Sequence, residues 1–208
     1  MNNIIILGDS YSTFKGYIPN GYATYYPSLD VHELKETWWK QVVDSSGGNL
    51  LLNNSWSGST IGYTGYNNTD CSKSSAFIYR FRKLKEEGFF ENNRVDTVFV
   101  FGGTNDTWSN APLGEMQFSG WEEKDLYFVQ PAICHLMSAL KTELPKTDIY
   151  FIINTQIKPE IIDCIKEAGK YYNVETIELK DIEKESGHPN VAGMKSISEQ
   201  VLARLSRK

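Results

Sequence analysis

The positions of Ser10 and His188 in the sequence suit nucleophilic catalysis. Ser10 follows the apolar run 4–7 after only Gly8 and Asp9. A serine hydroxyl is a weak nucleophile and needs a base that takes its proton. Of the three histidines, only His188 is expected in a loop that follows a strand, and an imidazole titrates near neutral pH. The two residues are therefore a candidate nucleophile and base.

The base in such a pair is usually oriented by an acid. Glu185 precedes His188 by three positions in the stretch ESGHPN. A short turn there could fold the carboxylate back onto the imidazole. We therefore expect Glu185 to be the third catalytic residue.

Acyl transfer also needs hydrogen-bond donors that face the developing oxyanion. Gly58 has no Cβ, so its amide N–H can approach a ligand closely. Asn105, in the stretch GGTND, can offer a side-chain amide, and the Ser10 N–H can be a third donor. Ser10, Gly58 and Asn105 are the expected oxyanion hole.

Short apolar runs alternate with amphipathic runs along the whole chain. The predicted strands are 3–7, 49–53, 96–101, 148–153 and 174–179, and the predicted helices are 33–45, 74–87, 128–143, 159–171 and 190–206. This alternation predicts βαβ units, a buried parallel sheet and a three-layer α/β/α sandwich. No repeat or linker divides the sequence, so we expect one domain over residues 1–208.

The candidate residues all follow predicted strands, at the edge where open α/β sheets bind ligands. Segments 11–26 and 107–126 look like extended loops at the same edge. Three aromatic residues of the loops at this edge, Tyr11, Trp56 and Trp108, could line a substrate groove. Each of these side chains could equally make an ordinary contact between loops.

Composition excludes several function classes. The chain has 208 residues and a formal net charge of −5, with lysine and arginine scattered, so no nucleic-acid partner is expected. The basic run 80–85 is expected to be a solvated helix face. The three cysteines lie far apart and no cluster has metal-ligand spacing, so we expect no disulfide framework and no metal. Nothing in the sequence indicates an oligomeric state.

Membrane and secretion signals are also missing from the sequence. No apolar run is long enough to cross a bilayer. The N-terminus has neither the positive region nor the apolar stretch of a signal peptide. A cytoplasmic protein with no membrane partner is expected, although a chain already trimmed of its signal peptide would look the same.

Taken together, these motifs resemble the SGNH hydrolases, also called the GDSL esterase/lipase family. Ser10, Gly58, Asn105 and His188 match the four defining residues of that family in the right order. The resemblance implies a flavodoxin-like sandwich with five parallel strands. It also implies that Ser10 attacks an ester, that His188 is the base, and that Asp9 positions the serine turn.

The acid before His188 departs from the family pattern, in which aspartate stands three residues before the histidine. Here that residue is Glu185, one methylene longer. Asp181 and Glu183 are nearby substitutes, and some relatives support the histidine with a backbone carbonyl instead.

The expected function is that of a serine esterase that hydrolyses small acyl esters. Acetyl esters of a carbohydrate are favoured as substrates because the loops are rich in aromatic, Asn, Ser and Gly residues. One alternative is a glycan-binding protein on the same fold without catalysis. Another is a lysophospholipase or thioesterase with a longer acyl preference. No cofactor is expected, because no G-x-G-x-x-G follows a strand and GDSYSTFKG is not a phosphate-binding loop.

Overall fold

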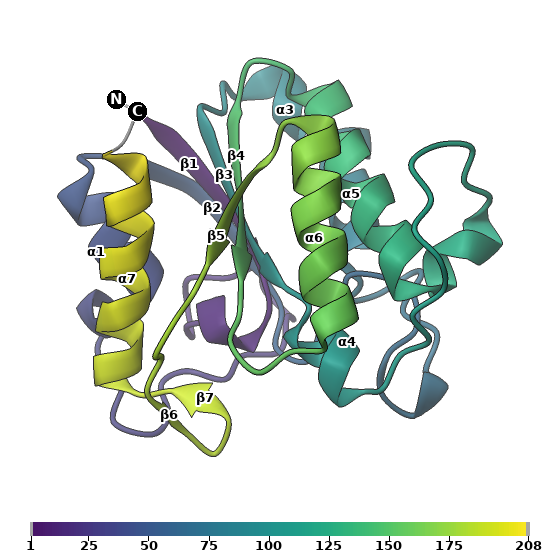
Figure 1. The fold of residues 1–208 in the computed structure, drawn as a ribbon. Helices are drawn as coiled ribbons and strands as arrows, with labels where there is room; N and C mark the ends of the chain where they lie inside the picture. The colour runs from purple at the N-terminus through teal and green to yellow at the C-terminus, as the bar shows by residue number, and fades with distance from the viewer. Residues whose placement is uncertain (1, 207–208) are drawn as a thin grey trace.

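The computed structural model describes residues 2–206. Its centre is a five-stranded parallel sheet with the strand order β2-β1-β3-β4-β5 (Figure 1). The strands are β1 (Asn3–Gly8), β2 (Asn49–Ser55), β3 (Thr97–Gly102), β4 (Asp148–Ile153) and β5 (Glu175–Glu178). The predicted sheet is confirmed, and the order is that of flavodoxin-like folds, which bind ligands where the order reverses between β1 and β3.

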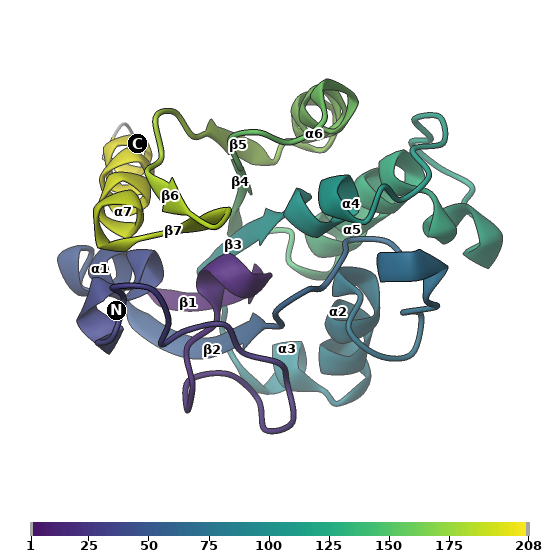
Figure 2. The same ribbon diagram turned by 90° about the horizontal axis from the view of Figure 1, so that it is seen from below.

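Helices cover both faces of this sheet and complete the predicted three layers. On one face lie α1 (Trp38–Ser45) and α7 (Val191–Leu205), which pack against each other. On the other face lie α2 (Phe77–Glu86), α5 (Val129–Glu143) and α6 (Pro159–Tyr172) (Figure 2). Two short helices, α3 (Phe89–Asn92) and α4 (Thr104–Trp108), complete the set of α-helices within 2–206.

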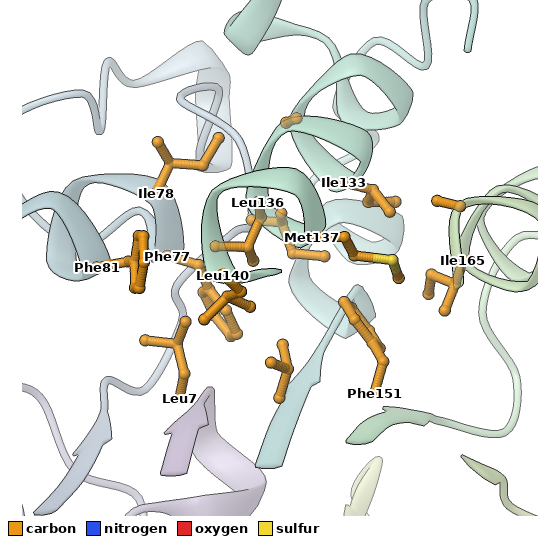
Figure 3. Packing of buried hydrophobic residues seen from close by; sticks show 14 of the residues in the cluster. Leu7, Phe77, Ile78, Phe81, Ile133, Leu136, Met137, Leu140, Phe151 and Ile165 are labelled. Atoms are coloured by element: carbon orange, nitrogen blue, oxygen red, sulfur yellow. The ribbon is translucent and has the colours of Figure 1, made fainter. Parts of the chain in front are cut away.

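The central strand β3 is buried along its whole length. Successive side chains of a strand point to opposite faces. Val98 and Val100 therefore join the core beneath α2, α5 and α6, whereas Phe99 and Phe101 join the core beneath α1 and α7. Figure 3 shows part of the first core, in which side chains of α2, α5 and α6 meet those of the sheet. Burial on both faces explains why the strand reads as one continuous apolar run.

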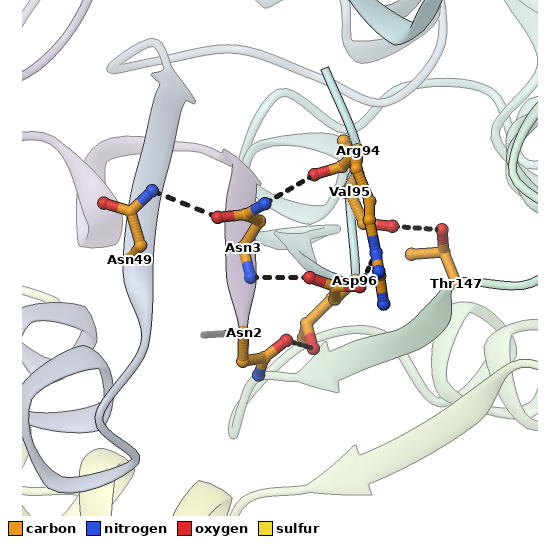
Figure 4. Close-up of polar contacts among 8 residues, drawn as sticks. Asn2, Asn3, Asn49, Arg94, Val95, Asp96 and Thr147 are labelled. Atoms are coloured by element: carbon orange, nitrogen blue, oxygen red, sulfur yellow. Dashed lines mark hydrogen bonds and ion pairs between the residues drawn. The ribbon is translucent and has the colours of Figure 1, made fainter.

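Polar contacts join the strands at the amino edge of the sheet (Figure 4). The Asn3 amide donates to the Asp96 carboxylate at 3.0 Å, and the Asn3 side chain donates to the Arg94 carbonyl at 2.9 Å. The Asn49 amide group donates to Asn3 Oδ1 at 3.1 Å. These bonds connect the first residues of β1 and β2 with the residues just before β3, far from the opposite edge, where the candidate residues lie.

Three predicted segments differ from the structure. The predicted helix 33–45 begins as α1 only at Trp38, because Thr37 caps it and the preceding residues form a separate 3₁₀ turn. The predicted helix 74–87 is shorter, since α2 begins at Phe77. The stretch after β3, expected to be a loop, contains α4, whose polar sequence TNDTW shows no apolar period.

Candidate active site

Ser10 begins a three-residue 3₁₀ turn directly after β1. Asp9 caps this turn, because its Oδ1 accepts a hydrogen bond from the Tyr11 amide at 3.0 Å. Gly8 allows a close approach here: a Cβ at this position would lie 2.6 Å from Ser55 Oγ. The sequence Gly-Asp-Ser therefore ends a buried strand and places the Ser10 side chain at the carboxyl edge of the sheet.

His188 lies on a small antiparallel pair that the sequence did not predict. The pair consists of β6 (Lys184–Glu185) and β7 (His188–Pro189). Ser186 and Gly187 connect them with φ angles of 49° and 79°, in the left-handed region that favours a tight turn. Figure 2 shows this pair and α4 around the same edge as the turn after β1.

The structure brings Ser10 and His188 together. The Nε2 atom of His188 lies 3.0 Å from Ser10 Oγ, although 178 positions separate the two residues. Both side chains are nearly buried, at 9% and 2% exposed. Burial lowers the pKa of His188, the hydrogen bond with the Ser186 carbonyl raises it, and the nearby Lys184 ammonium lowers it. The net effect is a pKa below the ordinary value, which favours the neutral imidazole that can accept a proton.

The second imidazole nitrogen meets a backbone carbonyl. Nδ1 of His188 lies 3.3 Å from the Ser186 oxygen. A carbonyl oxygen can only accept, so this contact assigns the proton to Nδ1 and leaves the lone pair of Nε2 facing Ser10.

The expectation that Glu185 orients His188 is wrong for this structure. The Glu185 side chain is exposed and makes no hydrogen bond with any residue of the described range. The tight turn instead brings the Ser186 carbonyl to Nδ1. Of the two substitute acids, Glu183 accepts a hydrogen bond from the Asn190 side chain, and Asp181 likewise has no contact with the imidazole within residues 2–206.

The three expected oxyanion donors lie on connected segments. Trp56, at the start of the Gly58 loop, donates its amide to the Gly8 carbonyl at 3.1 Å. Asn105, at the start of α4 and 2% exposed, donates Nδ2 to the Ser59 carbonyl at 3.0 Å. This bond uses one of the two Nδ2 hydrogens and leaves the other available.

The backbone amides of Ser10 and Gly58 make no hydrogen bond with any residue in the part of the chain that the structure describes. Gly58 has φ +81°, a conformation that other residues rarely adopt. Tyr66 fixes the orientation of the third donor, because its hydroxyl donates to Asn105 Oδ1 at 2.8 Å. Two main-chain donors and one oriented side-chain amide are therefore available to a bound anion.

Arg80 corrects the prediction of a solvated basic face. Its side chain is completely buried. One terminal nitrogen donates to the Gly8 carbonyl and to Ser59 Oγ, both at 3.1 Å, and the other donates to the Asn54 carbonyl. The guanidinium carbon also lies 4.5 Å from the centre of the Phe77 ring. Burial lowers the pKa of Arg80 to about 9, which still leaves the group charged at neutral pH.

The position of Arg80 could have been found from the helix period. Arg80 follows the buried Phe77 by three residues, and residues three apart share one helix face. The arginine therefore points inward with the core, and it connects the ends of β1 and β2 with the Gly58 loop.

Two buried carboxyl groups lie next to the candidate residues. Asp106 accepts the Ile61 amide with its two oxygens at 3.0 and 3.1 Å, which ties α4 to the loop after β2. Burial raises the pKa of Asp106 to about 6. Burial likewise raises the pKa of Asp9 to about 7, since the hydrogen bond from Tyr11 and the charge of Arg80 only partly oppose it.

The predicted substrate aromatics divide into two kinds. Tyr11 is fully buried, and its hydroxyl donates a hydrogen bond to the Gly187 carbonyl. The expected contact of Tyr11 with a substrate is therefore wrong for this structure. The side chain instead supports the turn that precedes His188. Trp108 is 42% exposed, with its ring 5.5 Å from that of His188. Trp56 is half-buried and packs on Tyr22 at 4.2 Å. The two tryptophans therefore remain available at the rim.

Sequence reasoning missed Tyr25. Its ring stacks on the His188 imidazole with a centroid distance of 3.6 Å and an interplanar angle of 7°. No local pattern marks it, because it lies in a loop rich in tyrosine. Only the tertiary structure brings this loop to a histidine near the other end of the sequence.

The structure shows neither a metal-binding cluster nor a membrane-spanning helix within residues 2–206. Within residues 2–206, no group of His, Cys, Asp and Glu side chains is arranged to hold a metal ion. None of the helices in that range combines the length and the apolar character needed to span a bilayer. The three cysteines are buried and unpaired.

A serine and a histidine in contact at the carboxyl edge of a five-stranded α/β/α sandwich define the class of α/β ester hydrolases. The chain belongs to the GDSL-like lipase/acylhydrolase family, whose model matches residues 2–205. It is an ester-hydrolysing enzyme. Among curated proteins, none matches the sequence.

Solved structures place the chain among close relatives. A protein from Bacteroides ovatus described as a GDSL-like lipase is 39% identical, with a TM-score of 0.92 over 100% of this chain and 99% of that one. A protein from Bacteroides uniformis with the same description is 40% identical, with a TM-score of 0.92 over 100% and 97% of the two chains. A family two carbohydrate esterase from Clostridium thermocellum, solved with cellohexaose, shares the fold at 15% identity and a TM-score of 0.69, covering 99% of this chain and 64% of that one.

Proposed function

We propose that the protein is a serine esterase that hydrolyses small acyl esters, acetyl esters of carbohydrates in particular, with Ser10 as nucleophile and His188 as general base. The observation that carries this proposal is the 3.0 Å distance between Ser10 Oγ and His188 Nε2. A nucleophile and its base need to lie within about 2.6–3.2 Å of each other. The family match over residues 2–205 further supports the proposal that the chain works as one domain.

The reaction would proceed in two steps. Ser10 Oγ attacks the ester carbonyl while its proton passes to His188 Nε2, and the same proton then passes to the leaving alcohol as the C–O bond breaks. Water next attacks the acyl-Ser10 ester and gives its proton to Nε2, and the acid departs as the Ser10 hydroxyl is restored. The Ser186 carbonyl keeps the imidazole in the required tautomer throughout.

The oxyanion of each tetrahedral intermediate would accept hydrogen bonds from the Ser10 and Gly58 amides and from Asn105 Nδ2. Asp9 supports this arrangement, because it caps the turn that orients the Ser10 amide. Losing one such donor typically lowers the rate about 10²–10³-fold.

Aromatic side chains at the rim of the site support this substrate class. Trp108 and Tyr66 are 42% and 39% exposed, and Trp56 lies on the Gly58 loop. Flat aromatic faces with polar edges suit sugar rings better than long flexible acyl chains. Structural neighbours described as a family two carbohydrate esterase and as an acetyl xylan esterase share this fold, which supports the proposal.

The test compares wild type, Ser10→Ala and His188→Ala on p-nitrophenyl acetate, butyrate and octanoate, and measures acetate release from acetylated xylan. We expect the acetyl ester to be the best of the series and both variants to lose at least about 10³-fold in kcat. A rate that rises with chain length would instead indicate a lysophospholipase or thioesterase preference. Full activity in Ser10→Ala would contradict the proposed mechanism.

A glycan-binding protein without catalysis is a second candidate, favoured because His188 Nδ1 meets the Ser186 carbonyl and no carboxylate among residues 2–206. Calorimetric titration of wild type and Ser10→Ala with cello- and xylo-oligosaccharides separates the two functions. Binding by both proteins, with no turnover of any acetyl ester by wild type, would support this second candidate.

A further inference from the structure

We propose that Tyr25 is a positioning residue for His188, which holds the imidazole against Ser10 and stabilises its protonated form. This inference rests on the proposed role of His188 as general base.

The stacking geometry of the two rings favours a protonated imidazole. The centroids of Tyr25 and His188 lie 3.6 Å apart at an interplanar angle of 7°, so one ring lies face to face over the other. Two neutral rings prefer an offset or an edge-to-face arrangement. A cation over the face of a tyrosine is attracted by the ring quadrupole. The contact therefore strengthens when His188 takes the proton of Ser10, and such a change stabilises the transition state rather than the bound substrate.

The other two rings near His188 do not stack in this way. Tyr11 lies 5.4 Å away at 51°, and Trp108 lies 5.5 Å away at 66°. Tyr25 is thus the one aromatic side chain among residues 2–206 that covers a face of the imidazole.

The Thr13 hydroxyl connects the backbone of Tyr25 with that of Ser10. The Tyr25 amide donates to Thr13 Oγ1 at 2.9 Å, and the same hydroxyl donates to the Ser10 carbonyl at 3.0 Å. The placement of the Tyr25 backbone therefore depends on the turn that presents Ser10.

The residues on either side of Tyr25 contact the remaining parts of the site. The Ala23 carbonyl accepts the Ser57 amide at 2.9 Å, next to Gly58. The Tyr26 hydroxyl donates to the Pro189 carbonyl at 2.6 Å, next to His188. One short segment thus holds the nucleophile turn, the loop after β2 and the His188 hairpin, with Tyr25 at its centre.

The groups around His188 offer its protonated form little other stabilisation. The titratable groups that face the imidazole are the Lys184 ammonium, which also interacts with Asp9, and the Tyr11 and Tyr25 phenols. No carboxylate within residues 2–206 makes a hydrogen bond with it. Burial and Lys184 both oppose the imidazolium, so a stacked aromatic face supplies part of the stabilisation that a carboxylate provides in a triad.

The test measures the pKa of His188 by NMR titration of histidine-labelled wild type, Tyr25→Leu and Tyr25→Phe, together with kcat and KM. Leucine keeps an apolar cover and removes the aromatic face, whereas phenylalanine keeps the face. We expect the pKa to fall by about 0.5–1 unit in Tyr25→Leu and to stay near the wild-type value in Tyr25→Phe. We also expect kcat to fall about 3–30-fold in Tyr25→Leu with little change in KM.

Tyr17→Leu is the matched control, because Tyr17 is an exposed tyrosine of the same extended loop, residues 11–26, and its ring contacts are with Phe14 and Trp39 and not with His188. Thermal unfolding of each variant checks its folding. An unchanged or raised His188 pKa in folded Tyr25→Leu would overturn the inference while leaving the esterase proposal intact. Loss of the esterase proposal would show separately, as full activity in Ser10→Ala.

Discussion

His188 is supported by a neutral carbonyl rather than by an ionised acid. In a triad, the carboxylate both selects the tautomer and stabilises the imidazolium. The Ser186 carbonyl can perform the first task but contributes only a dipole to the second. The chemistry proposed for this site therefore depends more on the oxyanion donors and on the rings around the imidazole than it does in a triad.

Replacement of Glu185 by glutamine tests this arrangement. Because the side chain is exposed and does not contact His188, we expect kcat/KM of Glu185→Gln to stay within about 3-fold of wild type. Loss of a true triad acid costs about 10⁴-fold. Steady-state kinetics on p-nitrophenyl acetate distinguishes the two values, and a loss above about 10²-fold would mean that the carboxylate reaches the imidazole during catalysis.

The pH dependence follows from the lowered pKa of His188. The proposed base can accept a proton only when it is neutral, so we expect kcat/KM to fall as pH drops through the pKa of His188 in the free enzyme. Because that pKa lies below the ordinary 6.5, we expect an acid limb centred below pH 6.5. A pH–rate profile of kcat/KM with its midpoint above pH 7 would contradict the assigned environment.

At the scale of the elements, the strands could be predicted because their apolar runs are buried by helices on both faces. β3 is the clearest case, with all six residues buried. The two-residue strands β6 and β7 could not be predicted, because they are too short to show an alternating pattern. The same limit concealed α4, whose five residues give one polar turn of helix.

Some residues of the candidate site could likewise be predicted from the sequence, and others could not. Ser10, Gly58, Asn105 and His188 could be proposed from the sequence because each follows a strand in a recognisable motif. The Glu185 prediction failed because sequence spacing does not reveal that the Ser186–Gly187 turn directs a carbonyl to Nδ1. Tyr25 could not be identified at all, since its contact with His188 depends on a loop path.

Arg80 gives a prediction about how the elements are joined. Replacement by methionine keeps much of the apolar stem but removes the guanidinium donor to the Asn54 and Ser75 carbonyls and one of the two donors to the Gly8 carbonyl. Each buried acceptor without a partner costs about 1–3 kcal/mol. We expect Arg80→Met to lower the free energy of unfolding by about 3 kcal/mol or more in urea denaturation.

Lys83→Met on the same helix is the control for Arg80→Met. Lys83 is exposed and its ion pair with Glu87 is long, at 3.7 Å, so we expect a change within about 0.5 kcal/mol. Equal effects of the two substitutions would show that Arg80 does not hold the strand ends together.

The protonation of the buried Asp9 makes the stability of the whole molecule depend on pH. Its pKa is raised from 3.8 to about 7, so the unfolded chain releases this proton well before the folded one. The contribution of Asp9 is therefore fully present below about pH 4 and is lost as pH rises through about 7. The burial of Asp9 beside Ser10 therefore costs stability near neutral pH.

Asp9→Asn tests this coupling. The amide can still accept the Tyr11 hydrogen bond but cannot ionise. We expect Asp9→Asn to gain about 2 kcal/mol relative to wild type when the pH is raised from 5 to 8, measured by urea denaturation at both pH values. Asp44→Asn, at an exposed position, should show the same difference at both pH values. An Asp9→Asn difference independent of pH would show that Asp9 is ionised in the folded protein at both pH values.

The most direct measurement of the central claim is covalent labelling with a fluorophosphonate, followed by peptide mass spectrometry. We expect one phosphonyl group per wild-type chain, attached to Ser10, and labelling at least about 10²-fold slower in His188→Ala. A wild-type protein that hydrolyses acetyl esters but is labelled at another residue, or that is labelled at Ser10 equally fast without His188, would contradict the pairing of these two side chains.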